Sequence, residues 1–439
     1  MKKFYYFISA ILFSGLISCS DNNADTIIDD NGKDEELTDG KYPAGSIVWK
    51  KDTVIILKDH FLVNKDQSLY IEEGASIIAS NSDLKPEIVV LGNLYSMGTA
   101  KRPVTFTVED ASKNDRFSRH WGGIICGFDS KEVVMQHTVI EYGGAQTTEN
   151  SLSFQHKLFK TETGEGVPAF HFCNPEGQFV IKNSIFRNNA EDHIYITGGK
   201  SIVENNKFIT NGFDGGEAIN YKSDCLADIA FNLIYDANTN AFKFSNGGFV
   251  NLQSHLVCYN NTLVNCGWRR PKIKGGSIWL EKNVFVELFN NLAIDCRWGL
   301  KHSIEEMEDE SSVVTPNFYY STTQIGVEQM AANSAQGIIN GKDDIYSAFG
   351  GDKNPLFANF TQQENININV SANEGDIPAL YNDAWSFAVK QGLPVFNGAT
   401  TSLNPHFSAN GLHFEGLKNL GGSEFKSSLP ANYFGAFGI

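Results

Sequence analysis

A short pattern returns five times in the middle of the chain: an asparagine, two residues, a large apolar residue, two more residues, and then usually Asn or Cys. The five copies are Asn183-Phe186-Asn189, Asn205-Phe208-Asn211, Asn232-Tyr235-Asn238, Asn260-Leu263-Cys266 and Asn291-Ile294-Arg297. Their leading asparagines recur after 22, 27, 28 and 31 residues. Units of this length cannot bury an apolar face alone, so they must stack on their neighbours in a solenoid.

The composition of these units decides the kind of solenoid. They are rich in Ile, Val, Phe and Asn, and they lack the long periodicity of roughly 3.6 residues that helical repeats show. A right-handed parallel β-helix fits best, an all-β fold in which each coil lies about 4.7–4.9 Å above the last. Asparagine side chains at one phase of such a stack can form a hydrogen-bonded ladder at the turns. We therefore expect a structural rather than a functional role for the asparagine rows.

The first 19 residues have the character of a secretion signal. Lys2 and Lys3 precede an apolar stretch from Phe4 to Leu16, which is too short to span a bilayer as a permanent helix. The run closes on Leu16-Ile17-Ser18-Cys19, which resembles the bacterial lipobox. That resemblance implies that Cys19 becomes the acylated first residue of the mature chain and anchors it to a membrane. The alternative is a free cysteine in a simple secretory signal.

Residues 20–43 are expected to form a disordered tether. Residues 20–40 contain eight acidic residues and one lysine, and they have few apolar side chains with which to build a core. An acidic stretch directly after the lipid-bearing cysteine resembles the surface-export signals of Bacteroidetes lipoproteins. This resemblance implies a location on the outer face of the outer membrane. The alternative is a solvated spacer that leaves the domain facing the periplasm.

Composition argues against nucleic acid as a partner. The formal net charge is −16, whereas nucleic-acid-binding proteins carry an excess of basic residues where they meet phosphate. Six cysteines follow Cys19, with no CxxC pair and no spacing typical of a Cys/His metal site. We interpret them as small apolar residues inside the coils. An oxidising compartment would permit disulfides, and the sequence leaves their pairing open.

A single β-helix is expected over residues 44–310. Strand patterns begin near Ile47 and continue without a linker into the asparagine coils. After residue 310 the coil rhythm fades, and residues 311–439 are predicted to form irregular last coils and a C-terminal cap, since an open solenoid end exposes unpaired strand edges. Within this region, Gln324–Ile338 is predicted as a short helix.

The order of several motifs in the first half resembles a family of Bacteroidetes outer-membrane lipoproteins with a pectate-lyase-like solenoid. The motifs are Ile47-Val48-Trp49, Tyr70-Ile71-Glu72-Glu73-Gly74, Ile88-Val89-Val90-Leu91-Gly92-Asn93-Leu94, Arg102-Pro103-Val104-Thr105-Phe106-Thr107 and His120-Trp121-Gly122-Gly123-Ile124. The likeness covers residues 44–310 at the level of coils. It implies a fold and a location, and it supplies no catalytic motif that transfers residue by residue.

A row of outward side chains on one sheet is the first functional candidate. Because alternate residues of a strand point outward, one strand of each coil can be aligned by its two inward apolar neighbours. This alignment predicts an outward row made of Tyr195, Asn220, Lys243, Trp279 and Lys301. Beside it, the sequence concentrates basic and aromatic residues, namely Trp268, Arg269, Arg270, Arg297 and Trp298.

These residue types suit the binding of a long sugar chain. Aromatic rings stack on the apolar face of a sugar, while amides and cations bind its hydroxyls or carboxylates. We therefore predict a polysaccharide-binding face. The alternative is that the exposed positions of a sheet simply favour Tyr, Trp and Lys.

An enzymatic interpretation rests on Asp214–Ser223, which resembles the acidic-Ile-x-x-Lys-Ser segment of β-helix alginate and chondroitin lyases. The resemblance implies that Lys222 is the base that takes the proton α to a uronate carboxyl group. It also implies Glu217 as a calcium ligand and an arginine of the Arg269-Arg270 pair as the neutralising group. The segment departs from the lyase motif at Ala218, where the lyases have a second acidic residue, and this departure puts the calcium site in doubt.

Three acidic residues are expected near one turn. Asp192 and Asp214 are 22 residues apart, as are Phe186 and Phe208, so the two carboxylates are predicted to stack at one phase, with Glu217 close by. Close carboxylates could hold calcium, act as an acid pair or cap a turn.

The sequence thus favours a lipid-anchored β-helix that binds polysaccharide or another extracellular ligand without catalysis, beside an outer-membrane uptake complex. Its alternatives are a uronate polysaccharide lyase that uses Lys222 and a structural or adhesive surface protein. No cofactor is expected for binding, and calcium is the one candidate.

Overall fold

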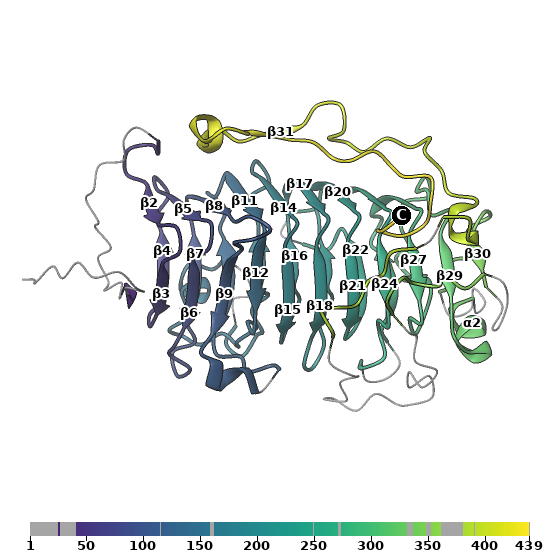
Figure 1. Cartoon of the computed structure of the whole chain (residues 1–439), viewed down its shortest axis with the longest axis horizontal. Helices are drawn as coiled ribbons and strands as arrows, with labels where there is room; N and C mark the ends of the chain where they lie inside the picture. The colour runs from purple at the N-terminus through teal and green to yellow at the C-terminus, as the bar shows by residue number, and fades with distance from the viewer. Residues whose placement is uncertain are drawn as a thin grey trace, which may run out of the picture.

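The computed structural model is a stack of parallel coils (Figure 1). It describes residues 41–114, 116–158, 162–248, 250–270, 274–331, 337–347, 353–360, 381–389 and 391–438, together with the backbone of Asp25–Thr26. Each regular coil contributes one strand to each of three parallel sheets, and the chain visits them in the order B, A, C. The predicted all-β, right-handed parallel β-helix is confirmed.

Sheets A, B and C are defined by their strands within the described residues. Sheet A contains β1 (Asp25–Thr26), β3 (Val54–Leu57), β6 (Ser76–Ala79), β9 (Val104–Val108), β12 (Thr138–Glu141), β15 (Ile185–Asn189), β18 (Lys207–Asn211), β21 (Leu233–Ala237), β24 (Thr262–Val264), β27 (Leu292–Ile294), β29 (Phe318–Tyr320) and β30 (Ile345–Tyr346). Sheet B contains β2 (Ile47–Trp49), β5 (Ser68–Glu72), β8 (Asn93–Met97), β11 (Glu132–Gln136), β14 (Gln178–Lys182), β17 (Gly199–Glu204), β20 (Cys225–Ala230), β23 (His255–Tyr259) and β26 (Phe285–Phe289). Sheet C contains β4 (Phe61–Val63), β7 (Ile88–Val90), β10 (Ile124–Cys126), β13 (Phe170–Phe172), β16 (Ile194–Ile196), β19 (Ile219–Tyr221), β22 (Asn240–Ser245), β25 (Gly276–Glu281) and β28 (Leu300–His302).

The core is the space that the three sheets enclose. Inward side chains stack on their own kind from coil to coil, as with Phe186 on Phe208, whose ring centroids lie 5.1 Å apart. All six cysteines of the described residues are free and buried. Their interpretation as small apolar residues of the coils is therefore confirmed.

A ladder of buried asparagines joins the coils where the chain passes from sheet B to sheet A. The ladder consists of Asn206, Asn232, Asn261, Asn291 and Asn317, and each side-chain amide donates to the next side-chain oxygen at 2.9–3.0 Å. Each ladder oxygen also accepts the backbone N–H of the residue one coil earlier, as with Asn232 N and Asn261 Oδ1 at 3.0 Å. The predicted structural role of asparagine is confirmed.

Three of the five leading asparagines do not occupy the ladder position that the repeat predicted for them. Asn183, Asn205 and Asn260 precede the ladder position by one residue and have φ of 55°, 58° and 49°. Asparagine tolerates this left-handed conformation, and the corner between the two sheets requires it. The repeat therefore combines two structural signals, a left-handed corner residue and the ladder residue that follows it.

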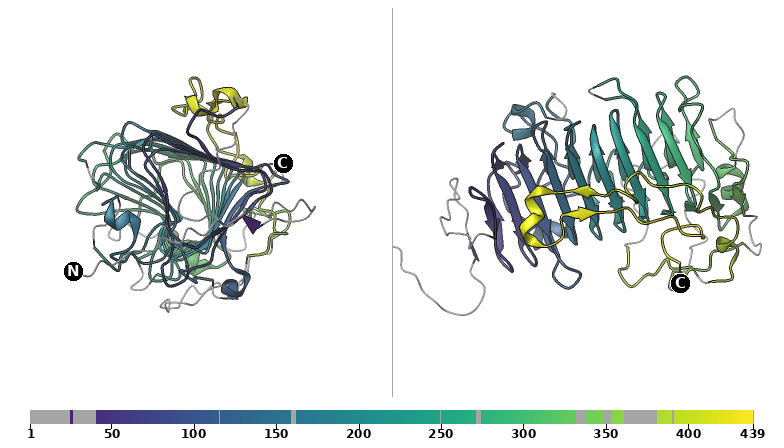
Figure 2. Two further views of the ribbon diagram at one scale, coloured as in Figure 1. Left: turned by 90° about the vertical axis from the view of Figure 1, so that its left-hand side faces the viewer. Right: turned by 90° about the horizontal axis from the view of Figure 1, so that it is seen from above.

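Beyond residue 310 the chain adds two strands to sheet A and then leaves the coils. β29 and β30 extend sheet A, and α2 (Gln324–Met330) confirms the first part of the predicted helix, although residues 332–336 lie outside the described residues. The final segment, which we call the C-terminal strap (residues 391–438), then turns back and runs along the solenoid (Figure 2). It contains two short 3-10 turns, η4 (Pro394–Phe396) and η5 (Glu415–Leu420), and the antiparallel pair β31 (Leu412–His413) and β32 (Glu424–Phe425).

The C-terminal strap covers the outer face of sheet B. Its apolar side chains Phe407, Leu412, Phe414, Leu417 and Phe425 pack on a row of strand residues that comprises Tyr70, Tyr95, Val134, Val180 and Ile202. Carboxylates of the same sheet bind its backbone. Asp228 accepts the N–H groups of His406 and Phe407 at 2.9 Å, and Glu132 accepts that of Glu415 at 2.9 Å.

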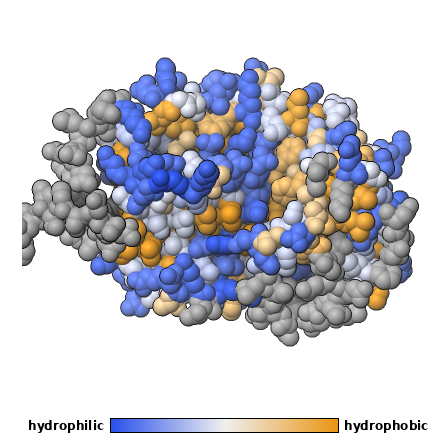
Figure 3. All heavy atoms as spheres, viewed as in Figure 1, coloured by the Kyte–Doolittle hydropathy of each residue, from blue (hydrophilic) through white to orange (hydrophobic). Residues whose placement is uncertain are grey.

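The second half of sheet A is covered as well. Outward residues from Ile209 to Tyr320 pack against Phe357, Phe387, Val395 and Phe434, which all come from the region after the last coils. Sheet C is covered at its start, where Leu158 and Val167 of the segment around α1 (Leu152–Gln155) pack on Val89 and Ile125. The face of the molecule in view in Figure 3 mixes hydrophilic and hydrophobic residues.

The predicted signal peptide, with Cys19, lies outside the described residues. Within the predicted tether, only the backbone of Asp25–Thr26 and residues 41–43 are described, and Asp25–Thr26 pairs in parallel with Val54–Ile55. In the described part of the chain, no helix has the length and apolar character needed to cross a membrane.

Removal of one ladder amide should destabilise the protein. Asn261→Leu removes the acceptor of the backbone and side-chain N–H groups of Asn232, and it removes the side-chain donor to the Asn291 oxygen, so the free energy of unfolding should fall by about 2 kcal/mol or more. Urea unfolding followed by circular dichroism measures this change. The matched control is Asn410→Leu in the C-terminal strap, where the side chain is exposed and the change should be small. Equal stabilities of the two variants would contradict the structural role of the ladder.

Candidate functional site

The predicted row forms on the outer face of sheet C. The pairing register places Tyr195 beside Asn220, Asn220 beside Lys243, Lys243 beside Trp279 and Trp279 beside Lys301. Their apolar inward neighbours belong to the core, as the alignment expected, whereas His302 is half-buried and contacts Glu308. None of the packed hydrophobic clusters of the described residues includes the row, in contrast to the outer faces of sheet B and of the second half of sheet A.

The row begins where the cover around α1 ends. His171 of β13 precedes Tyr195 in the register, and it is fully buried. Its Nε2 lies 3.1 Å from the carbonyl oxygen of Leu158, and burial lowers the pKa of its imidazole to about 4. From Tyr195 onward the ring and cation positions are only half-buried.

Cations and rings alternate along the row. The ammonium of Lys222, directly after β19, lies 5.5 Å from the ring centroid of Tyr195. The ammonium of Lys301 lies 5.6 Å from the Trp279 ring and 4.9 Å from the Trp298 ring. Between these two places, Lys243 forms an ion pair of 3.4 Å with Glu281, which also accepts the Trp279 indole N–H at 2.7 Å. The site is therefore amphipathic, with charges held close to aromatic faces.

An acidic group lies at the β16–β19 end of the row. One oxygen of Asp192 accepts the Asn220 side-chain amide and the other accepts the backbone N–H of Glu217, both at 2.8 Å. The Glu217 carboxylate in turn lies 3.4 Å from the amide of Asn240. Burial, and then the charge of Glu217, raise the pKa of Asp192 to about 8.

The two lysines near these acids have opposite pKa shifts. Burial lowers the pKa of Lys222, and the neighbouring charge of Lys243 lowers it further. Burial also opposes the charged form of Lys243, but the carboxylates of Glu217 and Glu281 outweigh it and raise the pKa of that group. Of these two lysines, Lys222 therefore loses its proton more readily than Lys243.

The structure buries three residues that the sequence placed on the binding face. Trp268, Arg269 and Arg297 are 5%, 2% and 2% exposed. Arg269 pairs with Asp236 at 3.0 Å and donates to the carbonyl oxygens of Asn211, Gly212 and Asp236. These contacts close the corners between coils. Their placement on the outer face was therefore wrong, because basic composition alone does not distinguish a surface cation from one that binds backbone carbonyls.

Two further predicted residues lie at the edges of the site. Arg270 is half-buried, and its guanidinium donates to the carbonyl oxygen of Asp214. Asp214 pairs with Arg119 at 3.3 Å and is half exposed. Its surroundings therefore differ from those of Asp192, which is buried. Trp298, in contrast, joins the row through its ring contact with Lys301.

The acidic residues Asp192 and Glu217 interact with N–H donors of the protein itself. In the described part of the chain, no group of three or more His, Cys, Asp or Glu side chains is placed to hold a metal ion. Both oxygens of Asp192 already accept N–H donors, whereas calcium requires six to eight oxygen ligands. The hydrogen bonds of Asp192 fit the turn-capping alternative.

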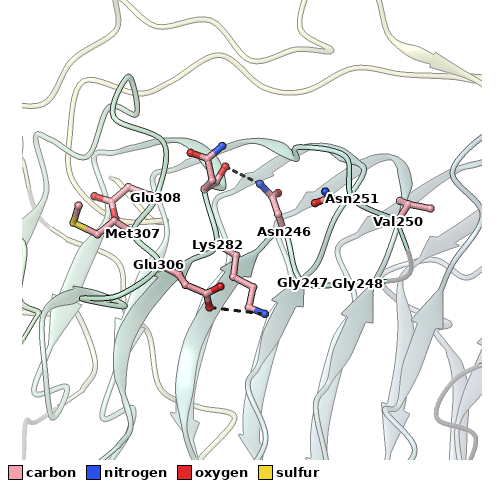
Figure 4. A pocket seen from close by; sticks show the side chains of 10 residues that line it. Asn246, Gly247, Gly248, Val250, Asn251, Lys282, Glu306, Met307 and Glu308 are labelled. Carbon is pink, nitrogen blue, oxygen red and sulfur yellow. Dashed lines mark hydrogen bonds and ion pairs between the residues drawn. The ribbon is translucent and has the colours of Figure 1, made fainter.

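An open pocket of about 820 Å³ adjoins the row at the carboxyl ends of β22, β25 and β28 (Figure 4). Its lining is mostly polar and comprises Asn246, Gly247, Gly248, Val250, Asn251, Lys282, Asn283, Glu306, Met307 and Glu308. Lys282 lies 3.9 Å from Glu306 across it, and Asn246 donates to the carbonyl oxygen of Asn283 at 2.6 Å. No motif signals this pocket, because three separate turns form it.

Glu281 belongs to the site and was not predicted. The signal was present, since Glu281 lies two residues after Trp279 and therefore on the same face of β25. It pairs with Lys243 of the adjacent strand β22, and it accepts the indole N–H of Trp279 on its own strand.

Two family models match the chain, one after the other. A pectate-lyase-like β-helix domain matches residues 40–157, and a right-handed β-helix region matches residues 163–319. Both models describe β-helices, in agreement with the observed fold. No curated protein and no solved structure gives a significant match. The second model covers all five strands that carry the row, so the row lies on a surface of the matched fold.

Proposed function

We propose that this pectate-lyase-like β-helix binds a polysaccharide chain along the outer face of sheet C without cleaving it. One observation carries the proposal. Rings, an amide and cations follow one another in register over five adjacent strands, on a face that the packed clusters of the described residues leave open. Four spacings between strands give the row a length of roughly 19 Å, which suits an extended chain rather than a single sugar.

The chemistry of the row supports a sugar ligand. The Tyr195 and Trp279 rings offer flat apolar surfaces, on which the C–H faces of sugar rings pack. Lys243 and Glu281 offer a donor and an acceptor beside them, and both are partly accessible, with side chains 24% and 17% exposed. Because these polar groups are already paired and hydrogen-bonded, they are held in place before a ligand arrives, which lowers the entropy lost on binding.

The proposal includes a location. A lipid on Cys19 would hold the domain at the outer membrane, and the acidic stretch after it favours the cell exterior. An outer-membrane uptake complex would then be the partner that receives the bound glycan.

Loss of one ring should weaken glycan binding. Trp279→Ala removes the central aromatic surface of the row, and retention on the polysaccharides that the wild type binds should fall by about tenfold. Affinity electrophoresis through gels that contain alginate, polygalacturonate, chondroitin sulfate, heparin, xylan or a β-glucan measures this retention. The control is Phe128→Ala, which removes an aromatic side chain that is 45% exposed outside the row. Unchanged retention of Trp279→Ala would refute the binding face. A wild type that no gel retards would favour the structural or adhesive alternative.

A second candidate function, uronate β-elimination, is favoured by the environment of Lys222. Its lowered pKa and its place beside Tyr195 suit a base that takes the proton α to a uronate carboxyl group. As that C–H bond breaks, a carbon–carbon double bond forms and the bond to the leaving sugar oxygen breaks, and the oxygen takes up a proton. Arg269 cannot neutralise the uronate carboxylate, because it is buried against Asp236. Lys243 would have to do so while it also pairs with Glu281.

The binding proposal predicts no elimination product. The protein from residue 41 onward should produce no rise in ultraviolet absorbance from unsaturated uronate with alginate, polygalacturonate, chondroitin or heparin, with or without calcium. Lys222→Ala serves as the matched variant. A rise in the wild type that this variant loses would show that the chain is a lyase and overturn non-catalytic binding.

A further inference from the structure

The charged groups of the row are not equivalent. Lys243 has a carboxylate partner in Glu281, and the charges of Asp192 and Glu217 also act on it. Lys222 interacts electrostatically with the same three acidic residues. Toward the β16–β19 end, each cation of the row therefore has nearby negative charge from the protein itself.

Lys301, at the other end of the row, is different. Its ammonium contacts the Trp279 and Trp298 rings, and it has no carboxylate partner among the described residues. Burial alone lowers the pKa of this group, with no charged neighbour contributing. Trp298 lies over Gly276, where a Cβ atom would come within 2.9 Å of the Trp298 Cβ. The glycine thus makes room for the second ring.

This arrangement is costly for the unliganded protein. A half-buried ammonium loses hydration, and a cation–π contact restores only part of that free energy. The chain has 51 acidic residues against 35 Lys and Arg, yet none of the described acids is placed beside Lys301. An anionic ligand would supply the missing negative charge.

We infer that Lys301, between Trp279 and Trp298, forms a subsite for the carboxylate or sulfate group of an acidic sugar. The ammonium binds the anionic group, and the indoles pack against the sugar ring that carries it. This inference rests on the proposed function and names the class of polysaccharide, namely a polyanionic one.

The test compares glycans that carry anionic groups with the same glycans in an uncharged form. Polygalacturonate is matched with its methyl ester, and dextran sulfate with dextran, by isothermal titration calorimetry at low and at moderate salt. The wild type should prefer an anionic member of a pair, and Lys301→Met should weaken that binding by about tenfold or more while binding to the neutral member is unchanged. The control, Lys200→Met, removes an exposed charge on sheet B and should have little effect.

The outcomes separate the two proposals. Equal binding of charged and uncharged members by the wild type, or an unchanged preference in Lys301→Met, would overturn the anionic subsite and leave the binding face intact. Binding of none of the four glycans would overturn the subsite, and retention in the gels of the wider panel would then decide the proposed function. Preference within the polygalacturonate pair would identify a carboxylate, and preference within the dextran pair a sulfate.

Thermal unfolding gives an independent readout. Because Lys301 has no carboxylate partner, Lys301→Met should unfold at the same temperature as the wild type or at a higher one. A lower unfolding temperature would show that the ammonium stabilises the fold through its aromatic contacts, and it would contradict the inference that this arrangement is costly without a ligand.

Discussion

The buried asparagine ladder is the interaction on which the rest of the structure depends. Each amide from Asn206 to Asn317 satisfies its neighbours at one corner, where the chain turns from sheet B to sheet A. Because side-chain direction alternates along a strand, a coil that shifted by one residue would turn its apolar side chains outward. The ladder therefore holds the register of the second half of the solenoid, and with it the alignment of the row on sheet C.

The C-terminal strap gives the three outer sheet faces of this regular solenoid different environments. Its apolar side chains and the carboxylates of Glu132 and Asp228 hold it on sheet B, and the segments before and within it cover the second half of sheet A. These covers protect apolar outer faces from water. On sheet C, beyond His171, the outward residues are instead rings and cations that remain partly accessible, with the buried amide of Asn220 between them.

How well the sequence predicts each feature depends on how local its cause is. The row from Tyr195 to Lys301 could be predicted because each of its strands has apolar inward neighbours at a spacing of two residues. The phase of the ladder was missed at Asn205 because the corner and ladder positions both favour asparagine. The burial of Arg269 and the course of the C-terminal strap depend on contacts between distant coils, such as the hydrogen bond from Tyr70 to the carbonyl oxygen of Gly416, 346 residues away. A local sequence pattern does not predict such contacts.

Hydroxyl-radical footprinting of the intact chain, free and with its best-retained polysaccharide, tests the central claim most directly. If the glycan binds along sheet C, Tyr195 and Trp279 are oxidised in the free protein and protected when the glycan is bound. Tyr70 and Tyr95, which lie beneath the C-terminal strap, react in neither state. Oxidation of Tyr70 and Tyr95 in the free protein would contradict the cover on sheet B. Glycan protection confined to sheets A and B would contradict binding along sheet C.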